Sequence, residues 1–198
     1  MLRSIWKRIA WMLLIAVGAA SHASAQALPA APHRTAGPAS IDLGVNYVAD
    51  IANAPPGTCG CFTMQGGGVN ARLRLTNHLS AVADFSVINT GKVPSYNFGL
   101  SLMTVMAGPQ FRHRLGRYTP YGQFLLGAVR GFHSVFPPSS SSSASGFIFA
   151  AGGGSEMMLS PKFSARLIEV DYMHSDLPNI SNNWQNHLKI AAGIIYHF

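Results

Sequence analysis

Two short segments hold the residue types of a serine nucleophile and its base. They are His78-Leu79-Ser80 and His174-Ser175-Asp176. A hydrolytic relay needs the serine, the histidine and a carboxylate within hydrogen-bond reach of one another. The second segment does not meet this need, because consecutive side chains of a strand point to opposite faces of the sheet. We therefore expect no relay within His174-Ser175-Asp176.

Cys59-Gly60-Cys61 is the other reactive group of the sequence. In an exported protein two such thiols oxidise, and one intervening residue allows only a small, strained disulfide ring. We expect Cys59 and Cys61 to staple a loop tip. Two thiolates are too few ligands for a zinc ion, and no histidine accompanies them, so neither a metal site nor a cofactor is predicted.

The first 39 residues have the pattern of an export leader. A basic start precedes an uncharged apolar run over residues 9–20, and Ala23-Ser24-Ala25 fits the small-x-small cleavage pattern. We predict a cleaved signal peptide over residues 1–25 and a flexible lead-in, rich in Ala and Pro, over residues 26–39. Cleavage removes three basic residues from a formal net charge of +7, so nucleic-acid binding is not expected.

From residue 40 onward, apolar and polar residues alternate with the period of a β-strand. In the last such segment one face is wholly apolar and consists of Leu188, Ile190, Ala192, Ile194, Tyr196 and Phe198. Seven earlier segments repeat the pattern, and turn residues separate them. We predict that residues 40–198 form an all-β fold, an eight-stranded antiparallel up-and-down transmembrane β-barrel.

The connections between these segments alternate in length. Residues 76–78, 115–117 and 159–162 form tight turns, whereas residues 49–60, 89–95, 132–145 and 173–186 form long loops. Outer-membrane barrels place short turns in the periplasm and long loops outside the cell, so both ends of the barrel are expected in the periplasm. His78-Leu79-Ser80 then lies at a periplasmic turn, far from the outer-leaflet lipid that lipid-modifying barrel enzymes use.

Charged residues of these strands fall on the face opposite the apolar one. A charge at the lipid-facing midplane costs about 2–4 kcal/mol, so these charges are expected in the lumen. The predicted luminal charge network consists of Arg72, Arg74, Asp84, Arg112, Glu156, Arg166, Glu169, Asp171 and Lys189.

Arg166 conflicts with the alternation, because Glu169 lies three residues further along the same strand. A β-bulge at Leu167-Ile168 would return Arg166 to the lumen. Alternatively, Arg166 lies low enough to snorkel to the periplasmic headgroups. We favour the bulge.

Three parts of the sequence resemble eight-stranded outer-membrane barrels. Residues 107–112 with Tyr121-Gly122 resemble the fourth and fifth strands of OmpX/Ail-type proteins. Residues 151–156 and 160–166 resemble strands six and seven of the OmpA transmembrane domain. The terminal segment, 192–198, is similar to the last strand of the whole superfamily, which also includes opacity-type porin-like proteins.

This resemblance implies roles for five residues. The OmpA residues that match Glu156 and Arg166 are interior charges, which implies that Arg166 lies in the lumen. The likeness of the last strand implies that Ile194, Tyr196 and Phe198 form the signal that the barrel-assembly machinery reads.

The long loops carry the predicted contact surface. Phe132, Phe136 and Trp184 are apolar groups among polar ones, which an interface would use. We predict a non-enzymatic barrel in the bacterial outer membrane, surrounded by its lipid and lipopolysaccharide, with a structural or adhesion-like role toward a surface partner. A narrow or gated channel for small solutes or ions is the alternative, and a lipid-modifying enzyme is a lesser one. The channel ranks second because side chains fill the bore of an eight-stranded barrel.

Overall fold

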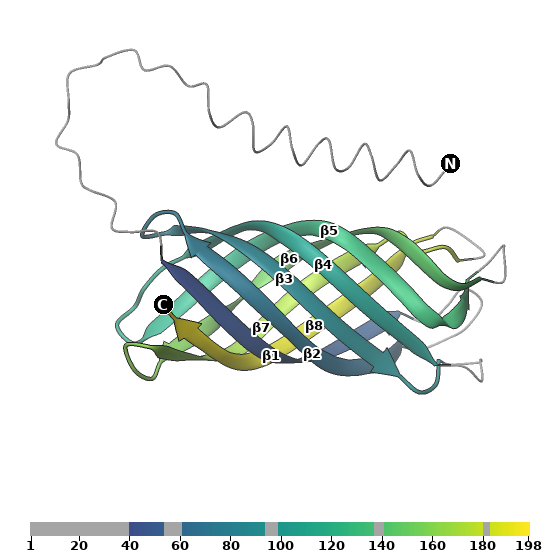
Figure 1. The fold of residues 1–198 in the computed structure, drawn as a ribbon, viewed down its shortest axis with the longest axis horizontal. Helices are drawn as coiled ribbons and strands as arrows, with labels where there is room; N and C mark the ends of the chain where they lie inside the picture. The colour runs from purple at the N-terminus through teal and green to yellow at the C-terminus, as the bar shows by residue number, and fades with distance from the viewer. Residues whose placement is uncertain (1–39, 54–60, 94–98, 137–140, 180–182) are drawn as a thin grey trace, which may run out of the picture. The chain divides into compact units, whose positions relative to one another are not determined.

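The computed structural model is a closed barrel of eight antiparallel strands in sequence order (Figure 1). It describes residues 40–53, 61–93, 99–136, 141–179 and 183–198. The strands are β1 (Ile41–Asn53), β2 (Cys61–Arg74), β3 (Leu79–Thr90), β4 (Leu100–Arg112), β5 (Tyr118–Phe136), β6 (Ser141–Met158), β7 (Phe163–Ser175) and β8 (Gln185–His197). The predicted fold class is confirmed. The signal peptide, the lead-in and Cys59 lie outside the described residues.

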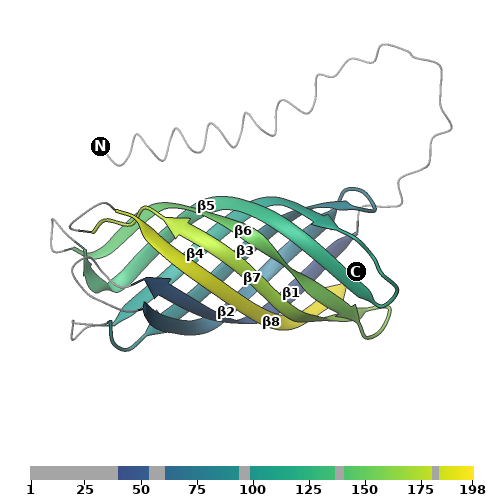
Figure 2. The same cartoon turned by 180° about the vertical axis from the view of Figure 1, so that it is seen from behind.

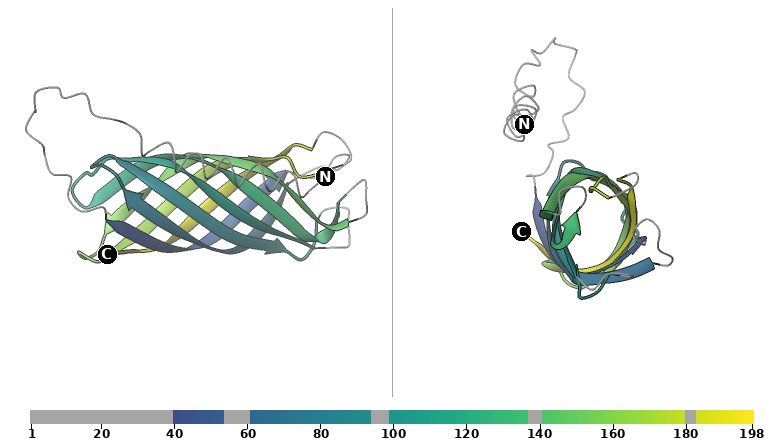
Figure 3. Two further views of the ribbon diagram at one scale, coloured as in Figure 1. Left: turned by 45° about the horizontal axis from the view of Figure 1, so that its top comes forward. Right: turned by 90° about the vertical axis from the view of Figure 1, so that its right-hand side faces the viewer.

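Pairing of the first strand with the last closes the sheet. β1 and β8 are antiparallel neighbours from Asp42↔His197 to Ala52↔His187, and they lie side by side in the two opposite views (Figures 1 and 2). Closure leaves no unpaired strand edge, which a sheet in hydrocarbon requires. Seen end-on, the strands form a continuous wall around the bore (Figure 3). Among the residues that the structure describes, no helix has the length and apolar character needed to cross a bilayer.

The outward face of the wall is apolar over a height that suits a membrane. In β3 the outward side chains run from Leu79 to Val87, and the next outward residue is Asn89. Eight residue steps cover about 27 Å along a strand, which corresponds to about 20 Å along the axis of a tilted barrel. This approaches the apolar band of about 25 Å that outer-membrane barrels carry.

β7 contains the bulge that the charge pattern predicts. Arg166 pairs with Gly193 of β8, whereas Glu169 pairs with Ala191, so three steps on β7 match two on β8. Leu167 and Ile168 are both exposed on the lipid-facing side. The extra residue brings Arg166 and Glu169 to the same, inner face, and the alternative of a snorkelling Arg166 is excluded.

Three tight turns and the C-terminus lie at one end of the barrel (Figure 1), which we call the turn end. The β4–β5 turn is closed by reciprocal backbone hydrogen bonds between Leu115 and Tyr118, and Gly116 has φ +59°. Glycine in this left-handed region at the first central position is typical of a type II′ hairpin turn, whose twist matches the strands. The opposite end carries the long connections, and we call it the loop end.

The strands continue further toward the loop end than the alternation predicts. β1 runs to Asn53, and β5 and β6 have 19 and 18 residues. Most of the predicted loops 49–60 and 132–145 is therefore strand where the structure describes it, and the prediction of loops there is wrong. Backbone pairing, such as Phe132↔Ser143, extends the ladder without needing an amphipathic side-chain pattern.

Candidate functional site

The lumen at the turn end is filled by ion pairs centred on Glu156. Its carboxylate accepts hydrogen bonds from Arg72 Nη1 at 2.8 Å and Arg112 Nη2 at 3.0 Å, and Arg166 Nη2 lies 3.4 Å away. These three arginines come from β2, β4 and β7, so the cluster spans the bore. Glu156, Arg72 and Arg166 are buried, as an interior network requires.

Asp42, at the start of β1, belongs to the same cluster. It accepts hydrogen bonds from Arg72 Nε at 2.9 Å and Arg74 Nη2 at 3.2 Å, and His197 Nδ1 lies 2.7 Å from it. Asp42 was not among the predicted network residues, although the alternation of β1 places it on the inner face with Arg72 opposite. The position of Asp42 on the same inward face as Arg72 is the sequence signal that predicts its place in the network.

Lys189 organises a second layer, nearer the middle of the barrel. Its Nζ lies 3.1 Å from Asp84, 3.3 Å from Glu169 and 3.8 Å from Asp171. Arg166 Nη1 lies 2.9 Å from Glu169 and so joins the two layers. All nine residues of the predicted luminal network therefore take part in ion pairs.

Neutral polar side chains complete these layers. Tyr121 donates a hydrogen bond of 2.7 Å to Glu169, and Gln123 donates to both oxygens of Asp171. Gln110 accepts from Arg72 and donates to Gln123. A buried charge is tolerated only when its hydrogen-bonding capacity is met, and these residues meet much of it.

A serine, a histidine and a carboxylate do come together, but not in either of the sequence triplets. His187 Nδ1 lies 3.0 Å from Asp50 Oδ1, and Ser175 Oγ lies 3.4 Å from His187 Nε2. The three residues stand on β1, β7 and β8, and their order is that of a hydrolytic relay. Asp50 was missed because it falls in a predicted loop.

This constellation lacks access for a substrate. Ser175 and Asp50 have no exposed surface, and His187 is 5% exposed. A serine attacks only a carbonyl carbon that can approach its Oγ to about 3 Å. The arrangement satisfies buried polar groups between strands, and it supports no hydrolysis in this conformation.

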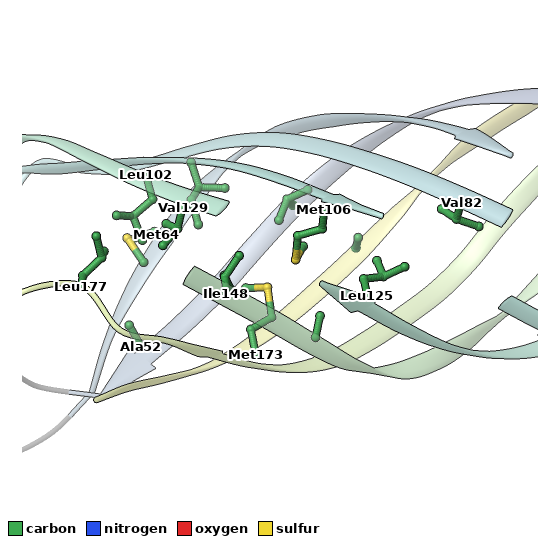
Figure 4. Close-up of a cluster of buried hydrophobic side chains, with 14 residues drawn as sticks. Ala52, Met64, Val82, Leu102, Met106, Leu125, Val129, Ile148, Met173 and Leu177 are labelled. Carbon is green, nitrogen blue, oxygen red and sulfur yellow. The ribbon is translucent and has the colours of Figure 1, made fainter. Parts of the chain in front are cut away.

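Apolar side chains fill the lumen toward the loop end (Figure 4). Ala52, Met64, Leu102, Val129 and Leu177 gather there in the close-up, whereas Val82 lies apart. The cluster consists of Val48, Ala52, Met64, Val82, Ile88, Leu102, Met106, Leu125, Val129, Ile148, Ala150, Met173, Leu177 and Ala191. The bore thus changes from mainly ionic to mainly apolar along its length, with the Asp50–His187 pair as a polar contact within the apolar part.

The predicted contact residues differ in their exposure. Phe136 is only 7% exposed and packs against Gly131, so its prediction as a contact residue is wrong. Trp184 is 63% exposed, and its ring meets the edge of His174. Phe132 is half-buried, with the Arg130 guanidinium 5.9 Å from its ring centre.

The remaining predicted sites lie on the barrel wall. Cys61 is exposed at the first residue of β2, and the staple with Cys59 stays a prediction. Ile194 is exposed on the outward face of β8, and Phe198 is exposed directly after the strand, with its ring centre 4.8 Å from that of Tyr196. Within the described parts of the chain, no group of three or more potential ligands could hold a metal ion.

Comparison with known proteins agrees with this architecture. Neisserial surface protein A has a TM-score of 0.62 and 17% identity, over 80% of this chain and 97% of its own. Ail, the attachment invasion locus protein of Yersinia pestis, in complex with the heparin analogue sucrose octasulfate, has a TM-score of 0.56 and 20% identity, over 81% of this chain and 99% of its own. Both are similar in fold.

A search of curated proteins finds no match. The family model described as "Outer membrane protein beta-barrel domain" matches residues 12–198. An apolar exterior, an ion-paired bore and this match agree, and the chain belongs to the outer-membrane protein β-barrel family.

Proposed function

We propose that this barrel is a non-catalytic outer-membrane protein that acts through its loop end toward a surface partner. Membership of the family implies an outer-membrane location. In the proposed orientation the turn end, with the C-terminal residue Phe198, faces the periplasm after export by the signal peptide. The loop end then faces outward, where the exposed side chain of Trp184 is available for contact.

The observation that carries the proposal is the filled bore. Three arginines and Lys189 hold carboxylates across the lumen at the turn end, and apolar side chains occupy it further on. A permeating ion would have to break these pairs and then lose most of its hydration shell among side chains that are mainly apolar. This argues for a structural or surface role over steady conduction.

The chemistry of the loop end indicates what kind of partner it fits. The segments 54–60, 94–98, 137–140 and 180–182 contain no charged residue. Lys92 and Arg130 are the Lys and Arg residues that the structure places toward this end, and Asp176 partly offsets them. A polyanion such as the sulfated sugar bound by Ail needs a dense group of cations, so we propose an apolar, uncharged partner surface.

Retention of intact cells on resins tests this proposal. Host bacteria that display the barrel are passed over phenyl-bearing and heparin-bearing resin. We expect retention on the phenyl resin alone, and Trp184→Ala is expected to reduce it. Phe111→Ala is the matched control, because Phe111 is an aromatic residue at the opposite end whose exposure, 62%, matches that of Trp184.

Two results would contradict the proposal. If the wild type and Trp184→Ala are retained equally on the phenyl resin, the loop end is not the contact surface. Retention on the heparin resin would indicate that the partner is a polyanion. Planar-bilayer recording of the purified barrel tests the alternative function, a channel. A steady conductance would favour the channel if the Glu156→Gln substitution alters it.

We further propose that Ile194, Tyr196 and Phe198 are read by the barrel-assembly machinery. Ile194, on the outer face of the closing strand, is 52% exposed, and Phe198, directly after the strand, is 71% exposed, so their side chains are accessible without opening the barrel. Phe163 of β7 lies 5.2 Å from Tyr196, centre to centre, and holds this aromatic group in place.

A further inference from the structure

The carboxylates of this protein are almost entirely internal. The sequence has seven Asp and Glu residues, and six of them are buried in the lumen. The seventh, Asp176, is exposed and follows β7 at the loop end. The outer surface of the turn end therefore carries no acidic side chain to offset its cations.

Basic residues lie on all three tight turns. We call the group the basic rim: Arg74, His78, His113, Arg114, Arg117 and Lys162. All but Arg74 are exposed, and the side chain of Arg74 is 41% exposed. The nearest carboxylates, Asp42 and Glu156, point into the lumen, where Arg72 pairs with both of them. Arg74 also pairs with Asp42, so among the rim residues it is the one whose charge is partly offset.

Two of the three turns set a cation beside an outward aromatic ring. Arg117 precedes Tyr118, and Lys162 precedes Phe163, both of which are about half exposed. Aromatic rings of this kind settle at the boundary between hydrocarbon and headgroups. A cation one residue further into the turn then reaches the plane of the lipid phosphates.

Local contacts hold the β4–β5 turn and its neighbour in place. Arg114 Nε donates to the carbonyl of Gly116 at 3.3 Å, which folds the side chain over its own turn. The turn is further tied to β6, because Met158 N donates to the Arg117 carbonyl at 2.8 Å. His78 and His113, from adjacent turns, stack with their ring centres 5.9 Å apart.

We propose that the basic rim binds the phosphate groups of anionic phospholipids in the leaflet that the turns meet. Arginine recognises phosphate through paired N–H donors, and cations close to an anionic membrane surface are attracted to it. The three turns are separated by strand pairs around the barrel, so the basic residues form a ring at headgroup level rather than a pocket for one soluble anion. The turns meet the inner leaflet in the orientation proposed above, on which this assignment of leaflet rests.

Lipid selectivity of the reconstituted barrel tests the proposal. The full barrel is placed in phosphatidylcholine vesicles, and electron paramagnetic resonance compares the association of spin-labelled phosphatidylglycerol and phosphatidylcholine. We expect wild-type protein to prefer phosphatidylglycerol severalfold, at up to about fivefold per contributing cation. Arg114→Gln with Arg117→Gln should remove most of this preference, and the preference should weaken in 0.5 M salt.

The matched control removes the same charge at the other end. Lys92→Gln with Arg130→Gln is expected to keep most of the preference, and Arg114→Lys with Arg117→Lys is expected to keep it as well. Lys162→Gln provides the test on a second turn if the paired arginine variant fails to fold, which the shift between boiled and unboiled samples on a gel reports. Inorganic phosphate at 10 mM is expected not to displace the lipid.

Several outcomes would overturn the inference. The first is equal lipid selectivity in the wild type and the rim variants. The second is a loss of lipid selectivity in the loop-end control as large as that in the rim variants. The third is displacement of the lipid by inorganic phosphate, which would indicate a site for a free anion. Symmetric vesicles present the same lipid to both ends. The result is therefore independent of the orientation and of the loop-end function proposed above.

Discussion

Replacing Lys189 by methionine should destabilise the barrel by about 3–5 kcal/mol. The ammonium is buried, and it lies 3.1, 3.3 and 3.8 Å from three carboxylates. At an effective dielectric constant of about 20, each of these contacts is worth about 4–5 kcal/mol of Coulomb attraction, most of which offsets the desolvation of the charges. Removing the cation alone leaves Asp84 and Asp171 buried without an ion-pair partner, which is the costly case.

Urea unfolding in detergent micelles measures this loss. Without residues 1–25, the predicted signal peptide, the chain has a single tryptophan, Trp184, whose fluorescence reports the transition. Lys92→Met is the control, because Lys92 is exposed, and it should change the free energy of unfolding by less than about 0.5 kcal/mol.

A double-mutant cycle gives the sharper test of the ion-pair argument. Asp84→Asn in the Lys189→Met background removes one of the unpaired carboxylates and should recover about 1–3 kcal/mol. A loss under about 1 kcal/mol for Lys189→Met, or no recovery in the double variant, would refute the view that this layer is held by mutual neutralisation.

Four further predictions follow from the wall and the bore. Val45→Arg places a charge on the lipid-facing side of β1 and should cost about 2–4 kcal/mol in the same urea titration, whereas Val45→Leu should be neutral. Deleting Ile168 removes the extra residue of the bulge and should turn Arg166 toward lipid, so the heat-modifiable band on a gel should disappear; its survival would show that the bulge is dispensable. Deleting Phe198 should lower the yield of assembled barrel in the outer membrane, and an unchanged yield would count against its role in assembly. A fluorophosphonate probe should leave Ser175 unlabelled, since its hydroxyl is enclosed; labelling would reveal a path into the lumen and favour an enzyme.

The faces of all eight strands could be predicted from the sequence because lipid imposes a strict rule. A charged side chain on the outer wall is expensive, so parity alone assigned Arg72 and Lys189 to the lumen. The same rule made Arg166 an exception that only a bulge or a headgroup position could explain. The structure has the bulge.

The residues near the loop end could not be assigned in this way. Beyond the apolar band neither side of a strand faces lipid, so the alternation of apolar and polar residues stops. The backbone hydrogen bonds between the strands continue. For this reason the sequence predicts a loop at Asp50, although Asp50 stands on β1 opposite Lys189. Phe136 was misjudged for a related reason: an aromatic residue in a loop-like context covers the interior here instead of facing a partner.

The Glu156 cluster also bears on how the cylinder comes together. Backbone pairing links each strand only to its two neighbours, whereas Arg72 on β2 meets Glu156 on β6, 84 positions later in the chain. An open sheet that has not yet acquired β6 leaves two arginines without their shared carboxylate. Asp42 on the adjacent strand β1 can neutralise Arg72 in such an incomplete sheet, but the ion pairs that cross the bore form only when β6 is added. The cluster therefore stabilises the closed barrel more than partly formed sheets, which makes assembly more cooperative.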